Sequence, residues 1–108
     1  MSGLKQSGAF DIAEPALKAI RKEFRAGRAS ERQVKAMIRD VQAETGYVLD
    51  PHTAVAVHVA ARMEKPSAAM ITLSTAHPAK FPDAVKNACG IDPALPSWLS
   101  DLMQREER

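Results

Sequence analysis

The chain has 108 residues, 45% hydrophobic and 26% charged, which fits one small folded domain with a modest core. Its formal charge of +2 does not indicate a nucleic-acid or acidic-membrane partner, although a basic bias runs from Lys5 to Arg39. The single cysteine, Cys89, excludes an internal disulfide, and no apolar run reaches the roughly 20 residues that cross a bilayer. We therefore expect a soluble, cytoplasmic protein.

The first predicted helix begins near Glu14, where Pro15 fits an early helical position because its missing amide costs nothing there. Gly27, just beyond the pattern, is expected to stop this helix. The apolar residues follow the helical period on one stripe: Ala13, Leu17, Ile20 and Phe24.

A second helix is predicted from Ser30, because Ser30 and Gln33 have the spacing of a capping box. Gly46 is expected to end it. Its buried stripe is Val34, Met37, Ile38 and Val41. Residues 1–46 are therefore interpreted as an antiparallel helical hairpin.

The third predicted helix starts at Asp50-Pro51, an N-cap candidate followed by a proline. Residues 53–61 are apolar nearly all round, which is typical of a helix enclosed by protein. A strand is the competing interpretation, because Val55, Val57 and Val59 alternate with other residues.

A break at residues 65–67 precedes an apolar run at residues 69–74, which has the length and composition of a buried strand. One strand cannot pair its own backbone groups, so the run indicates missing neighbours. Further helices are predicted from Pro82 to Gly90 and from Pro96. Residues 47–108 are thus expected to form a helix–strand–helix part, and the fold class is expected to be α/β, mostly helical with one clear buried strand.

Few sites for chemistry are suggested by the residues alone. The histidines lack metal-ligand spacing, and the glycines occur singly, so neither a zinc site nor a phosphate-binding loop is predicted. The candidates are Ser74, Thr75, His77 and Lys80, which follow the predicted strand at the position where α/β sheets bind ligands. The structural alternative is that Ser74 and Thr75 satisfy turn amides, His77 caps the next segment and Lys80 is solvated.

Two stretches resemble signatures from the C-terminal third of threonine synthases. They are residues 46–55, Gly-Tyr-Val-Leu-Asp-Pro-His-Thr-Ala-Val, and residues 73–82, Leu-Ser-Thr-Ala-His-Pro-Ala-Lys-Phe-Pro. Residues 4–8, 24–28 and 93–96 are also typical of bacterial members. The resemblance extends over essentially the whole chain, in family order, and its second stretch is long enough to be specific.

The resemblance implies a pyridoxal-phosphate (PLP) enzyme of the tryptophan-synthase-β fold type, which converts O-phospho-L-homoserine and water into L-threonine and phosphate. In that fold type a neutral hydroxyl contacts the pyridine nitrogen, and the resemblance assigns this contact to Thr75, with Ser74 as the adjacent alternative. His77 and Lys80 could help to hold the substrate phosphate. The helix start at residues 50–53 could face the pocket, although its role as a cap already explains it.

The sequence departs from the family pattern in one respect. It contains neither the Phe-Lys-Asp type motif of the Schiff-base lysine nor the glycine-rich phosphate loop, and Lys86 is interpreted as an exposed helical position. We therefore expect residues 1–108 to be the C-terminal segment of a threonine synthase, bordering the PLP site in residues 47–108. Alone it is expected to be inactive, and its expected partner is the remainder of the enzyme chain.

The sequence is also compatible with two other classes of function. A small helical nucleic-acid-binding module is suggested by basic residues along the first two helices: Lys18, Arg21, Lys22, Arg25, Arg32, Lys35 and Arg39. Interspersed acidic residues and the scarcity of aromatic residues weaken that hypothesis. The third class is a protein-interaction module that docks through the apolar helix at residues 53–61.

Overall fold

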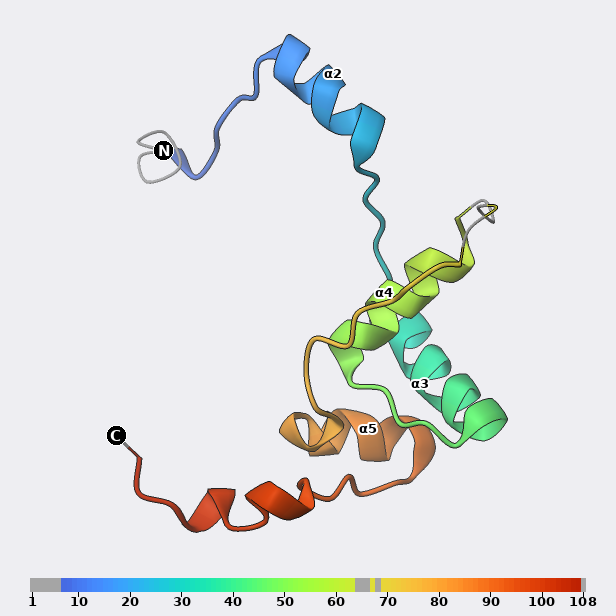
Figure 1. Cartoon of the computed structure of the whole chain (residues 1–108), viewed down its shortest axis with the longest axis vertical. Coiled ribbons are helices and arrows are strands. Elements are labelled where there is room, and N and C mark those ends of the chain that lie inside the picture. Colours follow the sequence, from blue (N-terminus) through green and yellow to red (C-terminus); the bar gives the residue numbers. More distant parts are fainter. Residues whose placement is uncertain (1–6, 64–66, 68, 108) are drawn as a thin grey trace.

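A computed structural model describes residues 7–63, 67 and 69–107. The helical elements, in chain order, are α2 (Glu14–Glu23), α3 (Glu31–Thr45), α4 (Pro51–Ala61), η1 (Pro78–Lys80), α5 (Pro82–Cys89), η2 (Ser97–Leu99) and η3 (Leu102–Gln104), where η marks a 3₁₀-helix. Helices α3, α4 and α5 lie together, while α2 and the η2–η3 segment extend away from them (Figure 1). The Cα radius of gyration is 18.2 Å, above the roughly 13 Å of a compact chain of 100 residues.

The core forms where α3 packs against both α4 and α5. Its buried residues are Ile38, Leu49, Ala54 and Ala88, and Val34, Met37, Val41, Val57 and Cys89 are packed around them. Val85 on α5 is fully buried as well. The predicted apolar stripe of α3 is therefore confirmed, with Ile38 at its centre.

The ends of these three helices follow from local chemistry. Ser30 and Gln33 form the predicted capping box before α3, and the Asp50 side chain caps α4. Gly46 and Gly90 end α3 and α5 in the left-handed conformation, each with φ of 76°. The predicted boundaries of the three helices are confirmed at these residues.

Helix α2 differs from its prediction in both its end and its packing. It ends at Glu23, and Phe24 is already extended, so Gly27 does not stop it. None of its residues is buried, and it projects away from α3 rather than packing along it as a hairpin (Figure 1). Gly27 instead lies against α4, where a Cβ atom at this position would be 2.6 Å from Val59 Cγ1.

Helix α4 is covered on one side only. Thr53, Ala54 and His58 are buried, whereas Ala56 and Ala61 are exposed. The expectation that protein encloses this helix is therefore not met within the described residues. The helical interpretation of residues 53–61 is nevertheless confirmed over the competing strand.

The predicted strand at residues 69–74 is wrong. This segment runs in an extended path over α4 (Figure 1), and no strand occurs anywhere in the described residues. The segment is not buried either: Ile71 is 81% exposed and Leu73 is 73% exposed. The apolar composition indicated a strand, but a ladder needs a second extended backbone paired with it, and none of the described residues supplies one. The fold is thus mostly helical and not α/β. Residues 65–66 of the expected break, like residues 4–6 of the resemblance, lie outside the described residues.

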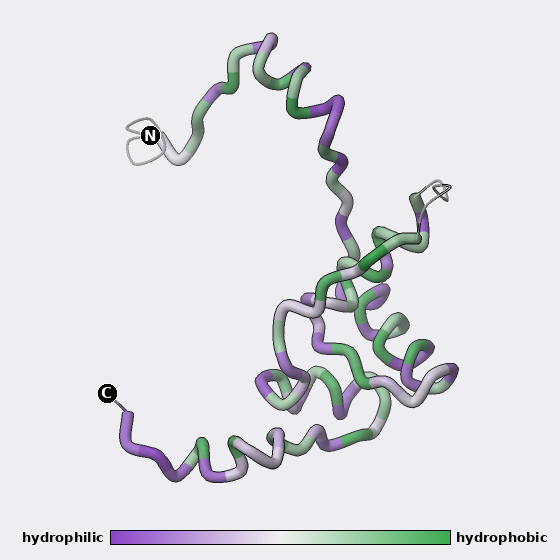
Figure 2. Tube along the Cα trace, in the orientation of Figure 1, coloured by the Kyte–Doolittle hydropathy of each residue, from purple (hydrophilic) through white to green (hydrophobic). Residues whose placement is uncertain are grey.

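The C-terminal arm, residues 91–107, also departs from expectation. The helix predicted from Pro96 is replaced by two short 3₁₀ turns, η2 and η3, and Trp98 is 77% exposed. Figure 2 shows hydrophobic residues along this arm and along the segment that crosses α4, as well as in the core. Among the described helices, none has the length and apolar character needed to span a membrane.

Candidate functional site

A surface concavity of about 390 Å³ gathers three of the four predicted site residues. Ser74, Thr75 and His77 line it together with Tyr47, Val48, Ala76 and Pro78. Lys80 is not among the lining residues. The structure therefore brings the segment after the extended run against the loop before α4, and it leaves Lys80 outside.

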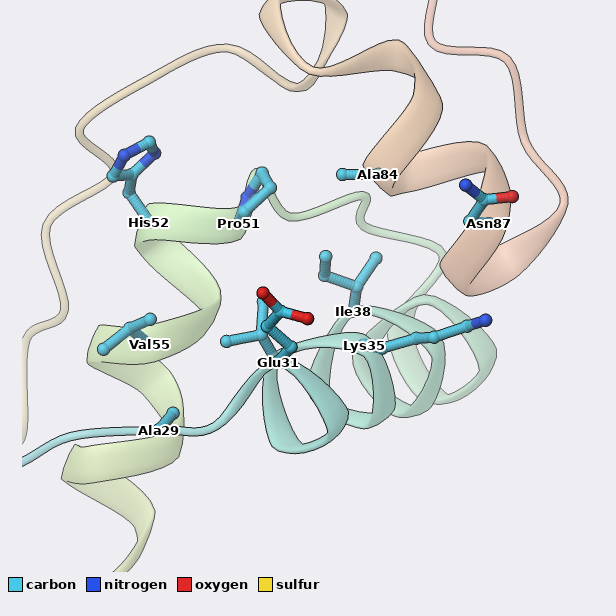
Figure 3. Close-up of a pocket in the computed structure, with 10 residues that line it drawn as sticks. Ala29, Glu31, Lys35, Ile38, Pro51, His52, Val55, Ala84 and Asn87 are labelled. Atoms are coloured by element: carbon cyan, nitrogen blue, oxygen red, sulfur yellow. The ribbon is translucent and has the colours of Figure 1, made fainter.

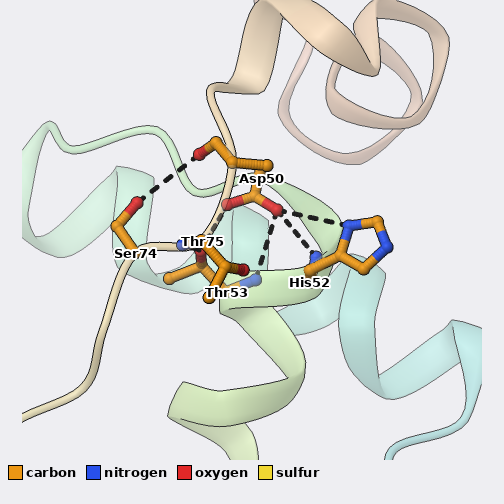
Figure 4. A network of polar contacts seen from close by, with 6 residues as sticks. Asp50, His52, Thr53, Ser74 and Thr75 are labelled. Carbon is orange, nitrogen blue, oxygen red and sulfur yellow. Dashed lines mark hydrogen bonds and ion pairs between the residues drawn. The ribbon is translucent and has the colours of Figure 1, made fainter.

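The two candidate hydroxyls at residues 74 and 75 are used differently. The Ser74 hydroxyl donates locally to the Ala76 carbonyl oxygen over 3.5 Å, as the structural alternative anticipated. The Thr75 backbone amide donates to Thr53 Oγ1 over 3.3 Å (Figure 4). The Thr75 side chain is exposed and, within the described part of the chain, its hydroxyl makes no hydrogen bond. Thr75 thus lines the concavity and has a hydroxyl with no partner among the described residues, while its backbone amide is bound to Thr53 of α4.

The support beneath Thr75 is a buried carboxylate at the start of α4. Asp50 is 1% exposed, and its Oδ1 accepts from the His52 amide at 2.9 Å and the Thr53 amide at 3.3 Å. The Thr53 hydroxyl donates to Asp50 Oδ2. Figure 4 shows these contacts converging on Asp50, with Thr75 drawn next to Thr53. We name this connected set of Asp50, Thr53 and Thr75 the α4 relay.

His77 and Lys80 have local structural roles. His77 Nδ1 accepts from the Ala79 amide over 3.2 Å, which caps the η1 turn as the structural alternative anticipated. Lys80 Nζ lies 6.0 Å from the centre of the Phe81 ring, within reach of a cation–π contact. The Phe81 ring in turn lies 4.9 Å from the His52 ring, so it joins η1 to the start of α4.

Sequence reasoning missed two features. The first is the α4 relay: the sequence indicates Asp50 and Thr53 as part of a helix start that could face the pocket, but no local signal pairs residue 53 with residue 75. The second is a groove of about 490 Å³ between α3, α4 and α5, which depends on how three helices are assembled (Figure 3). It is lined by Ala29, Glu31, Val34, Lys35, Ile38, Pro51, His52, Val55, Ala84 and Asn87. Across the described ranges, no three His, Cys, Asp or Glu side chains gather as metal ligands would.

The concavity suits the ring-nitrogen contact that the resemblance assigns to Thr75. A hydroxyl can donate to an unprotonated pyridine nitrogen, and no aspartate or glutamate lines the concavity to compete for that position. Thr75 is an exposed residue, and its backbone amide is bound to Thr53 of α4. The residues present therefore fit a neutral contact to the PLP ring.

Comparisons with known proteins all identify similarity to threonine synthases. The family model described as "Threonine synthase, C-terminal" matches residues 53–108. The threonine synthase of Pseudomonas aeruginosa is 41% identical over 110 residues, covering 100% of this chain and 24% of its own length. The threonine synthase of Saccharomyces cerevisiae is 38% identical over 93 residues, covering 79% of this chain and 18% of its own length.

A crystal structure of PLP-bound threonine synthase from Brucella melitensis matches with a TM-score of 0.86 and 57% identity. The match covers 99% of this chain and 23% of that one. The chain thus spans about a quarter or less of the length of these relatives. The resemblance found in the sequence is confirmed: the chain belongs to the threonine synthase family and corresponds to its C-terminal region.

Proposed function

We propose that this chain is the C-terminal part of a PLP-dependent threonine synthase, which converts O-phospho-L-homoserine and water into L-threonine and phosphate. Within it, the Thr75 hydroxyl contacts the pyridine nitrogen. The observation that carries the proposal is the 57% identity, over 99% of this chain, to a threonine synthase with bound PLP. The free Thr75 hydroxyl in the concavity supports the assignment of the contact. Family membership favours this function over the nucleic-acid-binding and protein-interaction alternatives.

The bound PLP would supply an electron sink for the carbon–hydrogen bonds broken in the substrate. The task of Thr75 is to hold the ring by a neutral hydrogen bond without adding charge at the nitrogen. Ser74 is the weaker choice, because its hydroxyl already donates to the Ala76 carbonyl. His77 keeps Nε2 for the substrate phosphate, because Nδ1 caps η1. Lys80, outside the concavity, would need its long side chain to reach the same phosphate.

The remainder of the enzyme chain is the proposed partner of this segment. It would supply the Schiff-base lysine and the glycine-rich phosphate loop, which residues 1–108 do not contain. It would also cover apolar side chains that this segment leaves exposed, such as Ile71, Leu73 and Trp98. Such an enzyme would work in the cytoplasm. The isolated chain should show no saturable PLP binding and should release no phosphate from O-phospho-L-homoserine.

The test of Thr75 uses the full-length enzyme that contains this sequence. Thr75→Val should weaken PLP binding about tenfold, because one hydrogen bond to the ring is lost. Thr75→Ser keeps the hydroxyl and should bind PLP within about threefold of the unmodified enzyme. The measurements are a titration of the cofactor absorption band and the rate of phosphate release from O-phospho-L-homoserine.

Ser74→Ala is the matched control, because it removes the neighbouring hydroxyl that donates to Ala76. It should leave PLP binding unchanged. If Ser74→Ala weakens binding and Thr75→Val does not, the ring contact belongs to Ser74. An unmodified enzyme that binds PLP but releases no phosphate from this substrate would contradict the proposed reaction itself.

A further inference from the structure

We propose that Asp50 and Thr53 are positioning residues for the cofactor: through the α4 relay they fix the main chain of Thr75, and so aim its hydroxyl at the pyridine nitrogen. This inference rests on the proposed function. It assigns a role in cofactor binding to two residues whose place at the start of α4 would otherwise be explained as helix capping alone.

The hydrogen bonds of the relay have a fixed direction. A carboxylate can only accept, so the Thr53 hydroxyl must donate its proton to Asp50 Oδ2. The oxygen of that hydroxyl is then left to accept, and the Thr75 amide donates to it over 3.3 Å. Asp50 therefore orients the Thr53 hydroxyl so that its oxygen can accept from the Thr75 amide.

Capping does not require this arrangement. The two amides at the start of α4 are satisfied by a single carboxylate oxygen, Oδ1. The second oxygen, Oδ2, is engaged by the Thr53 hydroxyl and connects onward to residue 75, which lies 22 positions further along the chain. Both side chains are buried, with Asp50 1% exposed and Thr53 4% exposed, so water competes little for these contacts.

The position of the segment that contains Thr75 depends on the hydrogen bond between the Thr75 amide and Thr53. Residues 69–76 lie outside any strand, and large apolar side chains such as Ile71 face solvent. Among hydrogen bonds between described residues, the one from the Thr75 amide to Thr53 is the only one that joins residues 69–76 to a helix of the core. Loss of the Thr53 acceptor would therefore free the backbone at the residue whose hydroxyl must be placed.

The test compares three variants of the full-length enzyme. Thr53→Val keeps the shape of the side chain and removes its acceptor, Thr53→Ser restores a hydroxyl, and Ala54→Gly is the control. Ala54 is the buried neighbour of Thr53 on α4, and its replacement by glycine destabilises the helix while removing none of the side-chain groups of the relay. Three quantities are measured: the Kd of PLP, the absorption spectrum of the bound cofactor, and the hydrogen-exchange rate of the Thr75 amide.

Thr53→Val should raise the Kd of PLP about tenfold, shift the cofactor absorption band and speed exchange of the Thr75 amide. Thr53→Ser should return the Kd to within about threefold of the unmodified enzyme. Ala54→Gly should lower the Tm while leaving the Kd and the spectrum unchanged. Equal weakening of PLP binding by Thr53→Val and Ala54→Gly, at equal loss of Tm, would overturn the inference, because the role of Thr53 would then be structural only.

Thr75→Val in the same assay separates this inference from the proposed function. If Thr75→Val weakens PLP binding and Thr53→Val leaves it unchanged, the relay does not position the hydroxyl and the inference alone fails. If Thr75→Val binds PLP as tightly as the unmodified enzyme, the proposed ring contact fails, and the inference fails with it.

Discussion

The three-helix core and the segments around it contain similar apolar residues but bury them very differently. Ile38 in α3 is 1% exposed, whereas Ile71 in the segment over α4 is 81% exposed. Ile38 belongs to the apolar stripe of α3 and Ile71 to an apolar run, and Figure 2 shows hydrophobic residues in both regions. The core buries its stripe because α4 and α5 face α3. Burial is thus decided by the presence of a partner surface and not by apolar composition.

The largest expected effect is that of Ile38→Ala, which attacks the core. Removing a fully buried isoleucine side chain costs roughly 2–5 kcal/mol, from lost transfer free energy and the cavity left behind. For a small domain this is a large share of the total stability. Urea unfolding followed by circular dichroism should show a much lower midpoint or loss of the helical signal in the absence of urea. A loss below about 0.5 kcal/mol would show that α3 does not organise the core.

Gly27→Ala should have an intermediate effect, because it tests where the segment between α2 and α3 contacts α4. An added Cβ would lie 2.6 Å from Cγ1 and 2.9 Å from Cγ2 of Val59, so the backbone at Gly27 or the Val59 side chain must shift. Overpacking of this kind costs about 1–3 kcal/mol. The same unfolding measurement on Val59→Ala and on the double variant supplies the control. The alanine at Gly27 should cost much less when Val59 is already truncated, and an equal cost in both backgrounds would contradict the contact.

The smallest effect is expected for Ile71→Ala in the isolated chain. The side chain is mostly in water already, so its truncation should change the free energy of unfolding by no more than about 0.5 kcal/mol. Paired with Ile38→Ala, this variant compares the same substitution inside and outside the core. A loss of roughly 2 kcal/mol or more at Ile71 would mean that the segment packs in solution and that the contrast between the two regions is smaller than described.

The helix ends of the core could be predicted because they depend on neighbours in sequence. Ser30 with Gln33, Asp50 with Pro51, and Gly46 each act within about one helical turn, and the structure confirms all three. Gly27 had the same local appearance as Gly46 but ends no helix. Its role is set by Val59, which lies 32 positions further along the chain and which no local pattern could indicate.

The strand and the relay could not be predicted for a related reason. Residues 69–74 have the composition of a strand, but strand formation is a property of two backbones and needs a neighbour. Thr75 was identified through the family resemblance, whereas its support from Thr53 was missed, because that hydrogen bond spans 22 residues. Local chemistry therefore predicted the helix ends, the resemblance singled out Thr75 among the candidate residues, and only the assembled chain showed its hydrogen bond to Thr53.

The α4 relay ends on the backbone amide of residue 75. The hydrogen bond that holds this residue therefore does not depend on its side chain. Because Thr53 accepts from the N–H of residue 75, serine or valine at that position would leave the anchor intact. Proline alone has no N–H to donate and would cut it. The side chain at residue 75 can therefore be exchanged while its backbone amide stays bound to Thr53. The chemical group at this position can change without any change in the structure of α4.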